Sequence, residues 1–280
     1  MEYRRRALVS FFALAWLLGG CSRQAESPKA EDGAPPSSTA ESADLLQGTR
    51  LVAPGKLTVC SDIPYAPFEF VAKGGDEGLT GFDVVLVRIL AERLGLTAEF
   101  KATPFDAIIP SLAAGNCDMV ASATTITDKR RQKVEFTAPY FDADQSLLVR
   151  ATDKDRYRAL ADLDDKAIGV QSGTTGERYA KTSAPEGATV KAFPGAEDLF
   201  NALTSGDIDA VLQDFPVNKY RALKTAGQFA VTETFKTGEQ YGFAVAKDNP
   251  RLVAALDSAL ERTRESGDYD TVYKTWFGDR

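Results

Sequence analysis

Hydrophobic positions along the chain change their spacing in a regular order from residue 57 onward. Residues 57–60 (LTVC) form a short apolar run that ends in polar residues, which predicts a buried strand. Apolar residues then recur with helical spacing over residues 86–94, and Gly95 is expected to end this helix. Residues 118–121 again read as a strand. Such alternation of strands and helices predicts a mostly parallel sheet flanked by helices.

Part of this pattern occurs twice. Residues 112–120 (LAAGNCDMV) match residues 203–211 (LTSGDIDAV) at a constant offset, and each stretch reads as a helix end, a glycine cap and a short strand. The strand pattern at residues 166–170 likewise matches that at residues 56–60. Two copies are too few for a solenoid. They predict two similar α/β lobes with a cleft between them.

The expected strand ends are polar in both lobes. In open α/β sheets a ligand binds beyond the carboxyl ends of the strands. The residues at these ends are Ser61, Asp62, residues 122–125, residues 171–175, Gln213 and Asp214. We therefore expect the functional site at this edge of both sheets.

Composition excludes several classes of function. The 280 residues carry a formal net charge of −7, which argues against a nucleic-acid partner. Histidine is absent, so neither a Ser-His-Asp nor a Cys-His nucleophile nor a His-containing zinc site can form. The three cysteines form no C-x-x-C pair. We expect neither a metal nor a cofactor.

The amino-terminal region is predicted to be a targeting segment. Three arginines at residues 4–6 precede the apolar residues 7–18, a pattern typical of a secretory signal peptide that spans residues 1–20. The ending LGGC resembles a bacterial lipobox, which implies cleavage before Cys21 and its lipidation; the alternative is an ordinary signal with an incidental cysteine. Residues 21–52 are rich in Ser, Ala, Glu and Pro and are expected to be disordered. The pattern thus predicts an extracytoplasmic body that is lipid-anchored to the cell membrane.

Several motifs together resemble the extracellular solute-binding proteins of family 3, the polar amino acid class of capture subunits of ABC importers. In chain order these motifs are DIPYAPFE at 62–69, GFD at 81–83, TITDKR at 125–130, GTT at 173–175, QD at 213–214, and GDY to WF at 267–277. The resemblance covers residues 55–278 and implies a monomer whose partners are an ABC permease and its ATPase.

The resemblance also implies the periplasmic-binding-protein type II fold, in which two hinge strands join the lobes. Lobe 1 is then discontinuous, because lobe 2 is inserted within it. The expected boundaries are residues 53–147 for the first part of lobe 1, 148–241 for lobe 2, and 242–280 for the return strand and terminal helices. The expected hinge strands are Leu147–Arg150 and Tyr241–Lys247, with Gly242 supplying backbone freedom.

Arg130 matches the arginine that binds a carboxylate in this family. A guanidinium matches a carboxylate in bidentate geometry and stays charged near neutral pH. Thr125 is expected to add its hydroxyl and N–H at the start of a short helix, with Ser122 and Ala123 beside it. The neighbouring Lys129 and Arg131 are expected to be solvated. The anion predicted here is the α-carboxylate of an amino acid.

Asp214 is expected to take the α-ammonium group from the opposite lobe, although a strand-end turn residue is the alternative because Pro216 follows. Thr174 stands three residues before Glu177, so its hydroxyl is expected either to cap a helix or to leave its N–H for the ligand.

Other residues are expected to contact the side chain of the ligand. Tyr65 and Phe105 match the aromatic walls of the family, and Asp62 is the expected specificity residue. A carboxylate between aromatic rings favours a cationic side chain and repels an acidic one. Gln171 and Gln213 are polar neighbours. Arginine or lysine is the first expectation for the ligand and glutamine the second.

Cys60 and Cys117 are expected to be free thiols. They lie on neighbouring predicted strands at heights that differ by about four residues, or roughly 13 Å, too far for a disulfide.

Two other classes of function stay open at this point. Secreted cyclohexadienyl dehydratases resemble the same family and use a carboxylic acid in the cleft as proton donor, a role for which Asp62 or Asp214 is a candidate. The other alternative is a ligand-sensing domain. Because Arg130 and Asp214 together suit an amino acid clamp, we expect a binding protein and no enzyme.

Overall fold

The computed structural model describes residues 45–72 and 78–279, all within the unit that spans residues 37–280. The predicted signal peptide, the predicted lipidation of Cys21 and the expected disordered segment as far as residue 44 lie outside the described residues. Among the helices that are described, none is long and apolar enough to cross a membrane.

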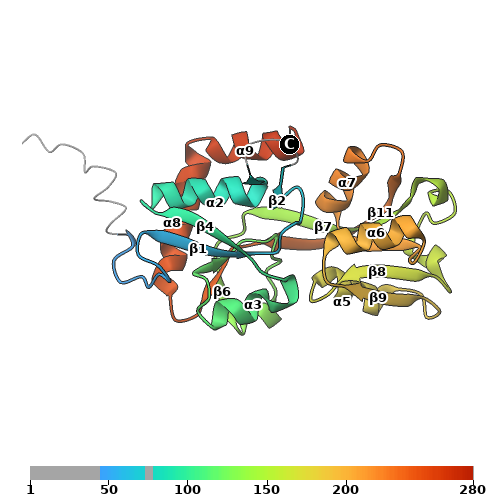
Figure 1. Cartoon of the computed structure of the whole chain (residues 1–280), viewed down its shortest axis with the longest axis horizontal. Coiled ribbons are helices and arrows are strands. Elements are labelled where there is room, and N and C mark those ends of the chain that lie inside the picture. The colour runs from blue at the N-terminus through green and yellow to red at the C-terminus, as the bar shows by residue number, and fades with distance from the viewer. Residues whose placement is uncertain (1–44, 73–77, 280) are drawn as a thin grey trace, which may run out of the picture. The chain divides into compact units, whose positions relative to one another are not determined.

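The first lobe contains a five-stranded sheet with the strand order β4-β1-β5-β12-β6 (Figure 1). In that order the strands are Thr97–Ala102, Lys56–Ser61, Met119–Val120, Ala244–Ala246 and Val134–Phe136. β1 is parallel to β4 and β5, whereas β12 is antiparallel to β5 and β6. The helices of this lobe are α2 (Phe82–Arg93), α3 (Phe105–Ala113), α4 (Asp128–Arg131), α8 (Pro250–Glu265) and α9 (Asp268–Phe277), and a small ribbon pairs β2 (Phe70–Val71) with β3 (Leu79–Thr80).

The second lobe contains a sheet with the strand order β11-β7-β10-β8-β9. In that order the strands are Phe229–Tyr241, Phe141–Arg150, Ala210–Asp214, Ala167–Gln171 and Thr189–Phe193. β8 is parallel to β9 and β10, whereas β7 is antiparallel to β10 and β11. The helical segments are η1 (Ala151–Asp153), η2 (Leu160–Leu163), α5 (Thr175–Ser183), α6 (Ala196–Ser205) and α7 (Phe215–Lys224).

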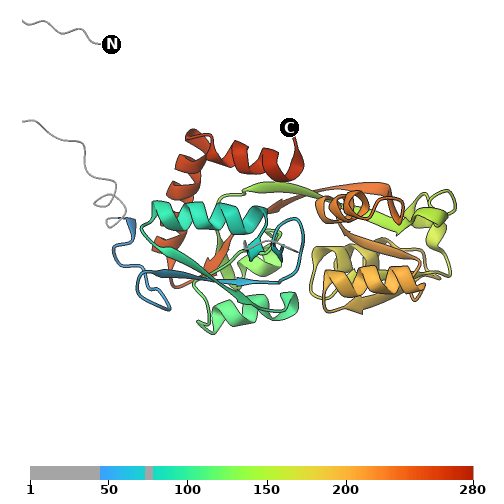
Figure 2. The same cartoon turned by 45° about the horizontal axis from the view of Figure 1, so that its top comes forward.

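Alternation along β1 explains why helices cover both faces of the first sheet. Leu57 and Val59 are fully buried in the core that includes α2, while Cys60 packs with Ile108 and Leu112 of α3. Successive side chains of a strand point to opposite faces, so a strand buried on both faces, as β1 is from Leu57 to Ser61, requires cover on both. Figure 2 shows α2 and α9 on one side of the strands and α3 on the other.

The repeated pattern corresponds to the same structure in each lobe. Gly115 follows α3 with φ 75°, and Gly206 follows α6 with φ 87°. Both values lie in the left-handed region, which glycine enters without steric cost. β5 and β10 then begin beside β1 and β8, respectively. The predicted two-lobe α/β fold is confirmed, although each sheet also contains antiparallel strands at one side.

The chain crosses between the lobes earlier than expected on its first passage. Leu147–Arg150 pair with β10 and β11 inside the second sheet, so the first crossing lies near residues 137–141. The second crossing lies between β11 and β12, within the expected Tyr241–Lys247. At Gly242 the requirement is space, because an added Cβ would lie 2.8 Å from Cδ1 of Ile126.

Residues 45–52, expected to belong to the disordered segment, pack against the first lobe. Leu51 contacts the hydrophobic core. The side chain of Arg50 forms an ion pair with Asp248, and its backbone carbonyl accepts a hydrogen bond from Asn249 Nδ2 at 2.7 Å. The ordered body therefore begins several residues before the predicted start at residue 53.

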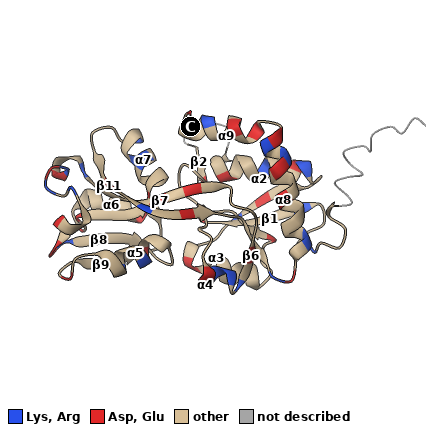
Figure 3. Ribbon diagram, turned by 180° about the vertical axis from the view of Figure 1, so that it is seen from behind, with Lys and Arg blue, Asp and Glu red and all other residues tan. Residues whose placement is uncertain are grey.

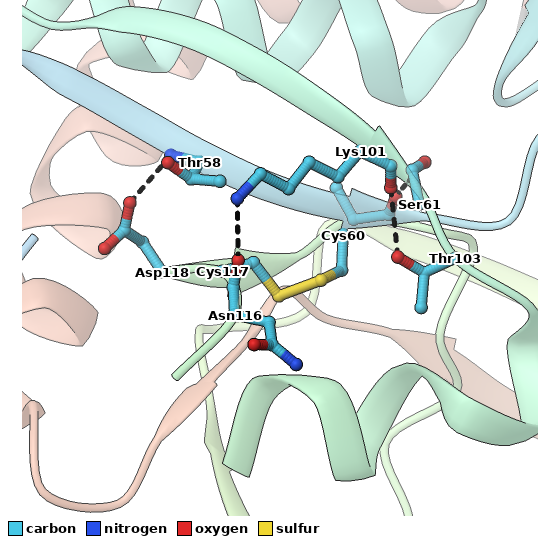
Figure 4. The surroundings of a disulfide bond; sticks show 9 residues. Thr58, Cys60, Ser61, Lys101, Thr103, Asn116, Cys117 and Asp118 are labelled. Atoms are coloured by element: carbon cyan, nitrogen blue, oxygen red, sulfur yellow. Dashed lines mark hydrogen bonds between the residues drawn. A yellow bond between two sulfur atoms is a disulfide. The ribbon is translucent and has the colours of Figure 1, made fainter. Parts of the chain in front are cut away.

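Cys60 and Cys117 form a disulfide with a Cα–Cα distance of 5.8 Å, so the expectation of two free thiols is wrong (Figure 4). That expectation counted residues along extended strands, whereas β5 is only two residues long. Residues 114–118 turn and bend after α3, and Asp118 Oδ2 accepts a hydrogen bond from the N–H of Thr58 at 2.7 Å. This turn brings Cys117 back alongside β1, within reach of Cys60.

Replacing both cysteines by alanine is expected to lower the free energy of unfolding by about 2–4 kcal/mol, because the disulfide closes a loop with a sequence separation of 57. Urea titration of the double variant and of the parent measures the difference. An unchanged midpoint would contradict a stabilising disulfide.

Candidate ligand-binding site

The carboxyl ends of β1, β5, β8 and β10 meet at a small cavity between the lobes. The cavity volume is about 10 Å³, close to the smallest space that admits one water molecule. The residues that line it are Tyr65, Phe105, Ala123, Thr125, Arg130, Gln171, Thr174, Thr175 and Asp214. All but Thr175 are among the residues singled out from the sequence.

Arg130 extends from α4 toward the second lobe. The helix begins after Thr127, whose hydroxyl accepts a hydrogen bond from Arg130 N at 3.2 Å. The Nη1 atom of Arg130 donates to the carbonyl of Thr125 at 2.7 Å, and its Nη2 atom donates to the carbonyl of Gly173 in the second lobe at 3.2 Å. Burial lowers the pKa of Arg130 from its ordinary value, but an arginine remains protonated near neutral pH. A positive charge therefore stands at the boundary between the lobes.

Phe105 forms the wall next to this charge. The Arg130 Cζ lies 5.1 Å from the centroid of the Phe105 ring, a distance suited to a cation–π contact. The ring also lines the cavity, so it packs against the guanidinium at the site.

Asp214 is the buried carboxylate at the end of β10, with an exposed fraction of 8%. Its Oδ2 accepts hydrogen bonds from the hydroxyls of Tyr65 and Tyr241 at 2.8 and 2.6 Å. Its Oδ1 accepts one from Nε2 of Gln145 at 2.5 Å. Burial raises the pKa of Asp214 to about 6, although the tyrosine hydroxyls oppose this rise. The structure thus gives Tyr65 a polar contact across the lobes in addition to its place in the wall.

Asp62 pairs with Gln171 across the lobes. The Gln171 Nε2 donates to Asp62 Oδ2 at 2.6 Å and to the carbonyl of Pro194 at 3.1 Å. Burial raises the pKa of Asp62 to about 6; the hydrogen bond from Gln171 opposes this rise and the charge of Asp106 adds to it. Gln171 lines the cavity, whereas Asp62 is not part of its lining.

Two other predicted residues do not line the cavity. Ser122 is buried, and its hydroxyl accepts a hydrogen bond from Asp62 N at 3.0 Å and donates to Glu69 Oε1 at 2.5 Å. Gln213 donates from Nε2 to Asn218 Oδ1 at 3.0 Å within its own lobe. Ser122 therefore links Asp62 to the buried Glu69, and Gln213 forms its hydrogen bond inside the second lobe.

The hydroxyl of Thr174 serves the helix that follows it. It accepts a hydrogen bond from Glu177 N at 3.0 Å and donates to the carbonyl of Gln171 at 2.7 Å. The capping alternative for this hydroxyl is therefore confirmed. Its backbone N–H as a ligand contact stays a prediction.

A further group of residues beside the cavity was not predicted from the sequence. Thr175 donates to Glu239 Oε2 at 2.9 Å, and Gln145 Nε2 donates to the same oxygen at 2.9 Å. Tyr241 ends β11, the strand that also carries Glu239. Figure 3 shows acidic positions along β7 and β11. Only the second threonine of the GTT motif at residues 173–175 gave a signal, because nothing in the pattern of a long strand marks the residues that turn toward a site.

Across the described residues, no group of three or more Cys, Asp and Glu side chains is placed to hold a metal ion. The cavity instead combines one guanidinium, backbone carbonyls, two aromatic rings and one buried carboxylate. Such a set recognises an organic molecule that carries both an anionic and a cationic group.

Two α/β lobes joined by two strands, with a polar cavity between them, define a protein that holds a small solute between its lobes. The sequence model of the bacterial extracellular solute-binding proteins, family 3, matches residues 57–279. The chain belongs to this family.

Characterised relatives agree with this membership over most of the chain. The histidine-binding periplasmic protein of Salmonella typhimurium is 34% identical over 232 residues, which cover 80% of this chain and 88% of that protein. The ABC transporter arginine-binding protein 1 of Escherichia coli is 34% identical over 219 residues, covering 76% and 87%.

Two solved structures are similar at the level of the whole fold. One is an ancestral arginine-binding protein bound to glutamine, with 38% identity, a TM-score of 0.76, and coverage of 81% of this chain and 100% of that one. The other is an ancestral amino acid-binding protein described as a precursor of cyclohexadienyl dehydratase, with 36% identity, a TM-score of 0.75, and coverage of 85% and 99%.

The Asp214→Asn variant is expected to lose part of the pH dependence of stability between pH 4 and 6. A folded-state pKa of about 6 lies above the unfolded value of 3.8, so the folded state binds more protons in this window and the free energy of unfolding falls as pH rises. Asparagine does not titrate, so the fall in the free energy of unfolding between pH 4 and 6 should be smaller in the variant by on the order of 1–3 kcal/mol.

Urea unfolding at several pH values measures this slope in both proteins. The asparagine can keep an oxygen as acceptor for Gln145 Nε2, and its Nδ2 can donate to the hydroxyl oxygens of Tyr65 and Tyr241, which now donate to Asp214 Oδ2. Equal slopes in variant and parent would show that Asp214 does not carry a raised pKa.

Proposed function

We propose that this protein captures a polar L-amino acid outside the cytoplasm for an ABC importer, and that a basic amino acid such as arginine or lysine is preferred, with glutamine second. The observation that carries this proposal is the placement of Arg130 and Asp214 around one cavity, each from a different lobe. An amino acid has two opposite charges close together, and this pair matches them.

The α-carboxylate is assigned to Arg130. The guanidinium now donates to two carbonyl oxygens, those of Thr125 and Gly173. A carboxylate in their place offers two charged acceptors in the fork geometry that a guanidinium prefers. Thr125 lines the same cavity with its hydroxyl among the buried groups, and it is the second assigned contact.

The α-ammonium is assigned to Asp214. Its carboxylate is held by donors from the first lobe and from both connecting strands, at distances of 2.5–2.8 Å. An ammonium group contributes a full positive charge, so it favours the ionised carboxylate more than a hydroxyl does.

The preference for a basic side chain is assigned to Asp62 together with Phe105. Asp62 is a half-buried carboxylate and Phe105 an aromatic ring. Both groups attract a guanidinium, an ammonium or an amide. Gln171 already places an amide nitrogen 2.6 Å from Asp62 Oδ2, which is the kind of donor that such a ligand would supply. Two relatives named for histidine and for arginine binding support the basic class.

Capture requires the lobes to move. The cavity that Arg130 shares with Asp214 measures about 10 Å³, too small for an amino acid, and the hollow of about 400 Å³ that also includes Arg130 does not include Asp214. For one ligand to contact both residues, the lobes have to separate and close around it. A ligand held by both lobes then favours the closed arrangement, because it interacts with both only there. The ABC permease and its ATPase are the proposed partners of that closed form, and lipidation at Cys21 is the proposed membrane anchor.

One relative favours a second candidate, a dehydratase on the same scaffold, since it is described as a precursor of cyclohexadienyl dehydratase. Asp62 and Asp214, each with a pKa near 6, are the candidate proton donors. Incubation with prephenate or arogenate distinguishes the candidates: formation of the aromatic product by absorbance supports the enzyme, and its absence together with amino acid binding supports capture.

Arg130→Ala is expected to weaken binding of the preferred amino acid at least a hundredfold. Removing the guanidinium leaves a buried carboxylate without its partner, which costs about 3–5 kcal/mol. A thermal-shift screen of the twenty amino acids identifies the ligand, and calorimetry then measures the dissociation constant.

Arg131→Ala is the matched control, because Arg131 belongs to the same helix but lies over Phe136, away from the cavity. The control should bind within twofold of the parent. A change of less than fivefold in Arg130→Ala would remove this residue from the ligand site.

Asp62→Asn is expected to change selectivity more than overall affinity. Loss of the negative charge should weaken arginine and lysine by tenfold or more while glutamine changes little, because an amide still accepts a neutral donor. Calorimetry with the three ligands gives the ratios. Equal losses for all three would show that Asp62 does not contact the ligand side chain.

A further inference from the structure

Two acidic side chains lie fully buried in the first lobe, beneath the loop that forms the rim of the cavity. Glu69 and Asp83 both have an exposed fraction of 0%. The N–H of Asp83 donates to the carbonyl of Phe68 at 3.0 Å, which places the two acidic positions on adjacent segments. The proposed clamp uses neither of them directly.

Each of these carboxyl groups contacts a different residue of the rim. Glu69 Oε1 accepts a hydrogen bond from the hydroxyl of Ser122 at 2.5 Å. Asp83 Oδ2 accepts from the N–H of Ala123 at 2.9 Å and from the hydroxyl of Tyr140 at 2.7 Å. Ser122 and Ala123 are consecutive in sequence, so the two carboxyl groups hold neighbouring points of one loop.

The second oxygen of each carboxyl group accepts no hydrogen bond from the described residues. Glu69 Oε2 and Asp83 Oδ1 are buried and have no hydrogen-bond partner among the described residues. Neither carboxyl group forms an ion pair with a lysine or arginine among the described residues. Two buried carboxylates without a cation are costly, and a proton retained by the pair removes one of the two charges.

We infer that Glu69 and Asp83 share one proton and thereby act as positioning residues that hold Ser122 and Ala123 at the rim of the cavity. The role in ligand binding rests on the proposed function, whereas the shared proton does not. Two further observations connect the pair to the site.

The first observation concerns Ala123, which has φ 42°, in the left-handed region that side chains other than glycine rarely enter. Its N–H is held by Asp83 in that conformation, and Ala123 lines the cavity. The second concerns Ser122, whose hydroxyl also accepts a hydrogen bond from the N–H of Asp62 at 3.0 Å. The pair therefore supports both the rim and the expected specificity residue.

Burial and the neighbouring negative charges favour retention of a proton by this pair. Burial raises the pKa of Glu69 well above its usual range, and the charges of Asp83, Asp62 and Asp214 raise it further, while the hydrogen bond from Ser122 opposes them. Burial raises the pKa of Asp83 to about 7, against the hydrogen bonds from Ala123 and Tyr140. Burial raises the pKa of the hydroxyls of Tyr65 and Tyr140, and the charge of Glu69 adds to the rise in both. Without histidine in the chain, such carboxyl groups are its means of titrating near neutral pH.

The test compares the parent with Glu69→Gln between pH 7 and 9. Glutamine supplies a neutral side chain of the same shape with N–H donors but no titration. In the parent, the folded state holds a proton that the unfolded chain has released, so the unfolding equilibrium constant should rise with pH, by at most tenfold per pH unit, until the proton is lost. The variant should show a flat profile.

Glu92→Gln is the matched control, because Glu92 is an exposed acid of α2. It should retain the profile of the parent. Infrared spectra at pH 7.5 should show a protonated-carboxyl band in the parent and in the control but not in Glu69→Gln. Absence of this band from the parent, or parallel profiles in parent and Glu69→Gln, would overturn the shared proton.

Calorimetry with arginine over the same pH range tests the positioning role. Between pH 7 and 9 the affinity of the parent for arginine should fall at least threefold more than that of Glu69→Gln. Titration of arginine itself affects both proteins equally and cancels in the ratio of the two affinities. Parallel losses would overturn the positioning role. If arginine binds none of the proteins, the proposed ligand class fails, while the unfolding and infrared measurements still decide the shared proton.

Discussion

The carboxylate of Asp214 is buried where the two lobes meet, and the need to satisfy this charge determines much of the arrangement around it. A buried carboxylate is tolerated only when donors surround it. Its donors come from a loop of the first lobe (Tyr65), from the end of β11 (Tyr241) and from β7 (Gln145). Both lobes and both connecting strands must therefore be in register for the site to exist, which couples the local chemistry to the relative position of the lobes.

Carboxyl groups perform several different tasks in this chain. Asp62 and Asp214 face the region of the cavity, Asp118 holds the turn after α3 against β1, and Glu239 orders Thr175 and Gln145. Each accepts hydrogen bonds from N–H or O–H donors, and of these four only Glu239 also has a cation among the ion pairs of the described residues, Arg178 at 4.0 Å. Hydrogen bonds of this kind fix direction more strictly than surface ion pairs do, which suits residues that must stay within a few tenths of an ångström of their positions.

The sequence was sufficient to predict the alternating elements, the two lobes and the strand ends that carry Asp62 and Asp214, because hydrophobic spacing and polar strand ends report on local structure. Arg130, on α4, was singled out by the resemblance of residues 125–130 to a family motif. Features that depend on non-local register were not predictable. Glu239 and Tyr241 follow an irregularity in the pairing of β11 with β7, between Phe235 and Glu239, and no spacing rule reveals which residues turn inward after such a shift.

The cysteine pair and the residues before β1 were misjudged for related reasons. A distance counted along ideal strands fails when the chain bends, as residues 114–118 do before β5. Composition alone suggested that residues 45–52 stay unfolded, yet Leu45, Leu46 and Leu51 find cover on the first lobe. Three apolar side chains in a polar segment are enough to dock it when a matching surface is nearby.

The docking of residues 45–52 also sets where the preceding chain departs from the folded body. Val52 N–H is bound by Asp118 near the amino-terminal end of β1, whereas the cavity lies beyond the opposite end of this strand of 6 residues, about 20 Å away. Residues 45–52 thus dock on the part of the first lobe that lies away from the cavity, and none of them belongs to its lining. This amino-terminal docking therefore adds contacts to the lobe without covering the site.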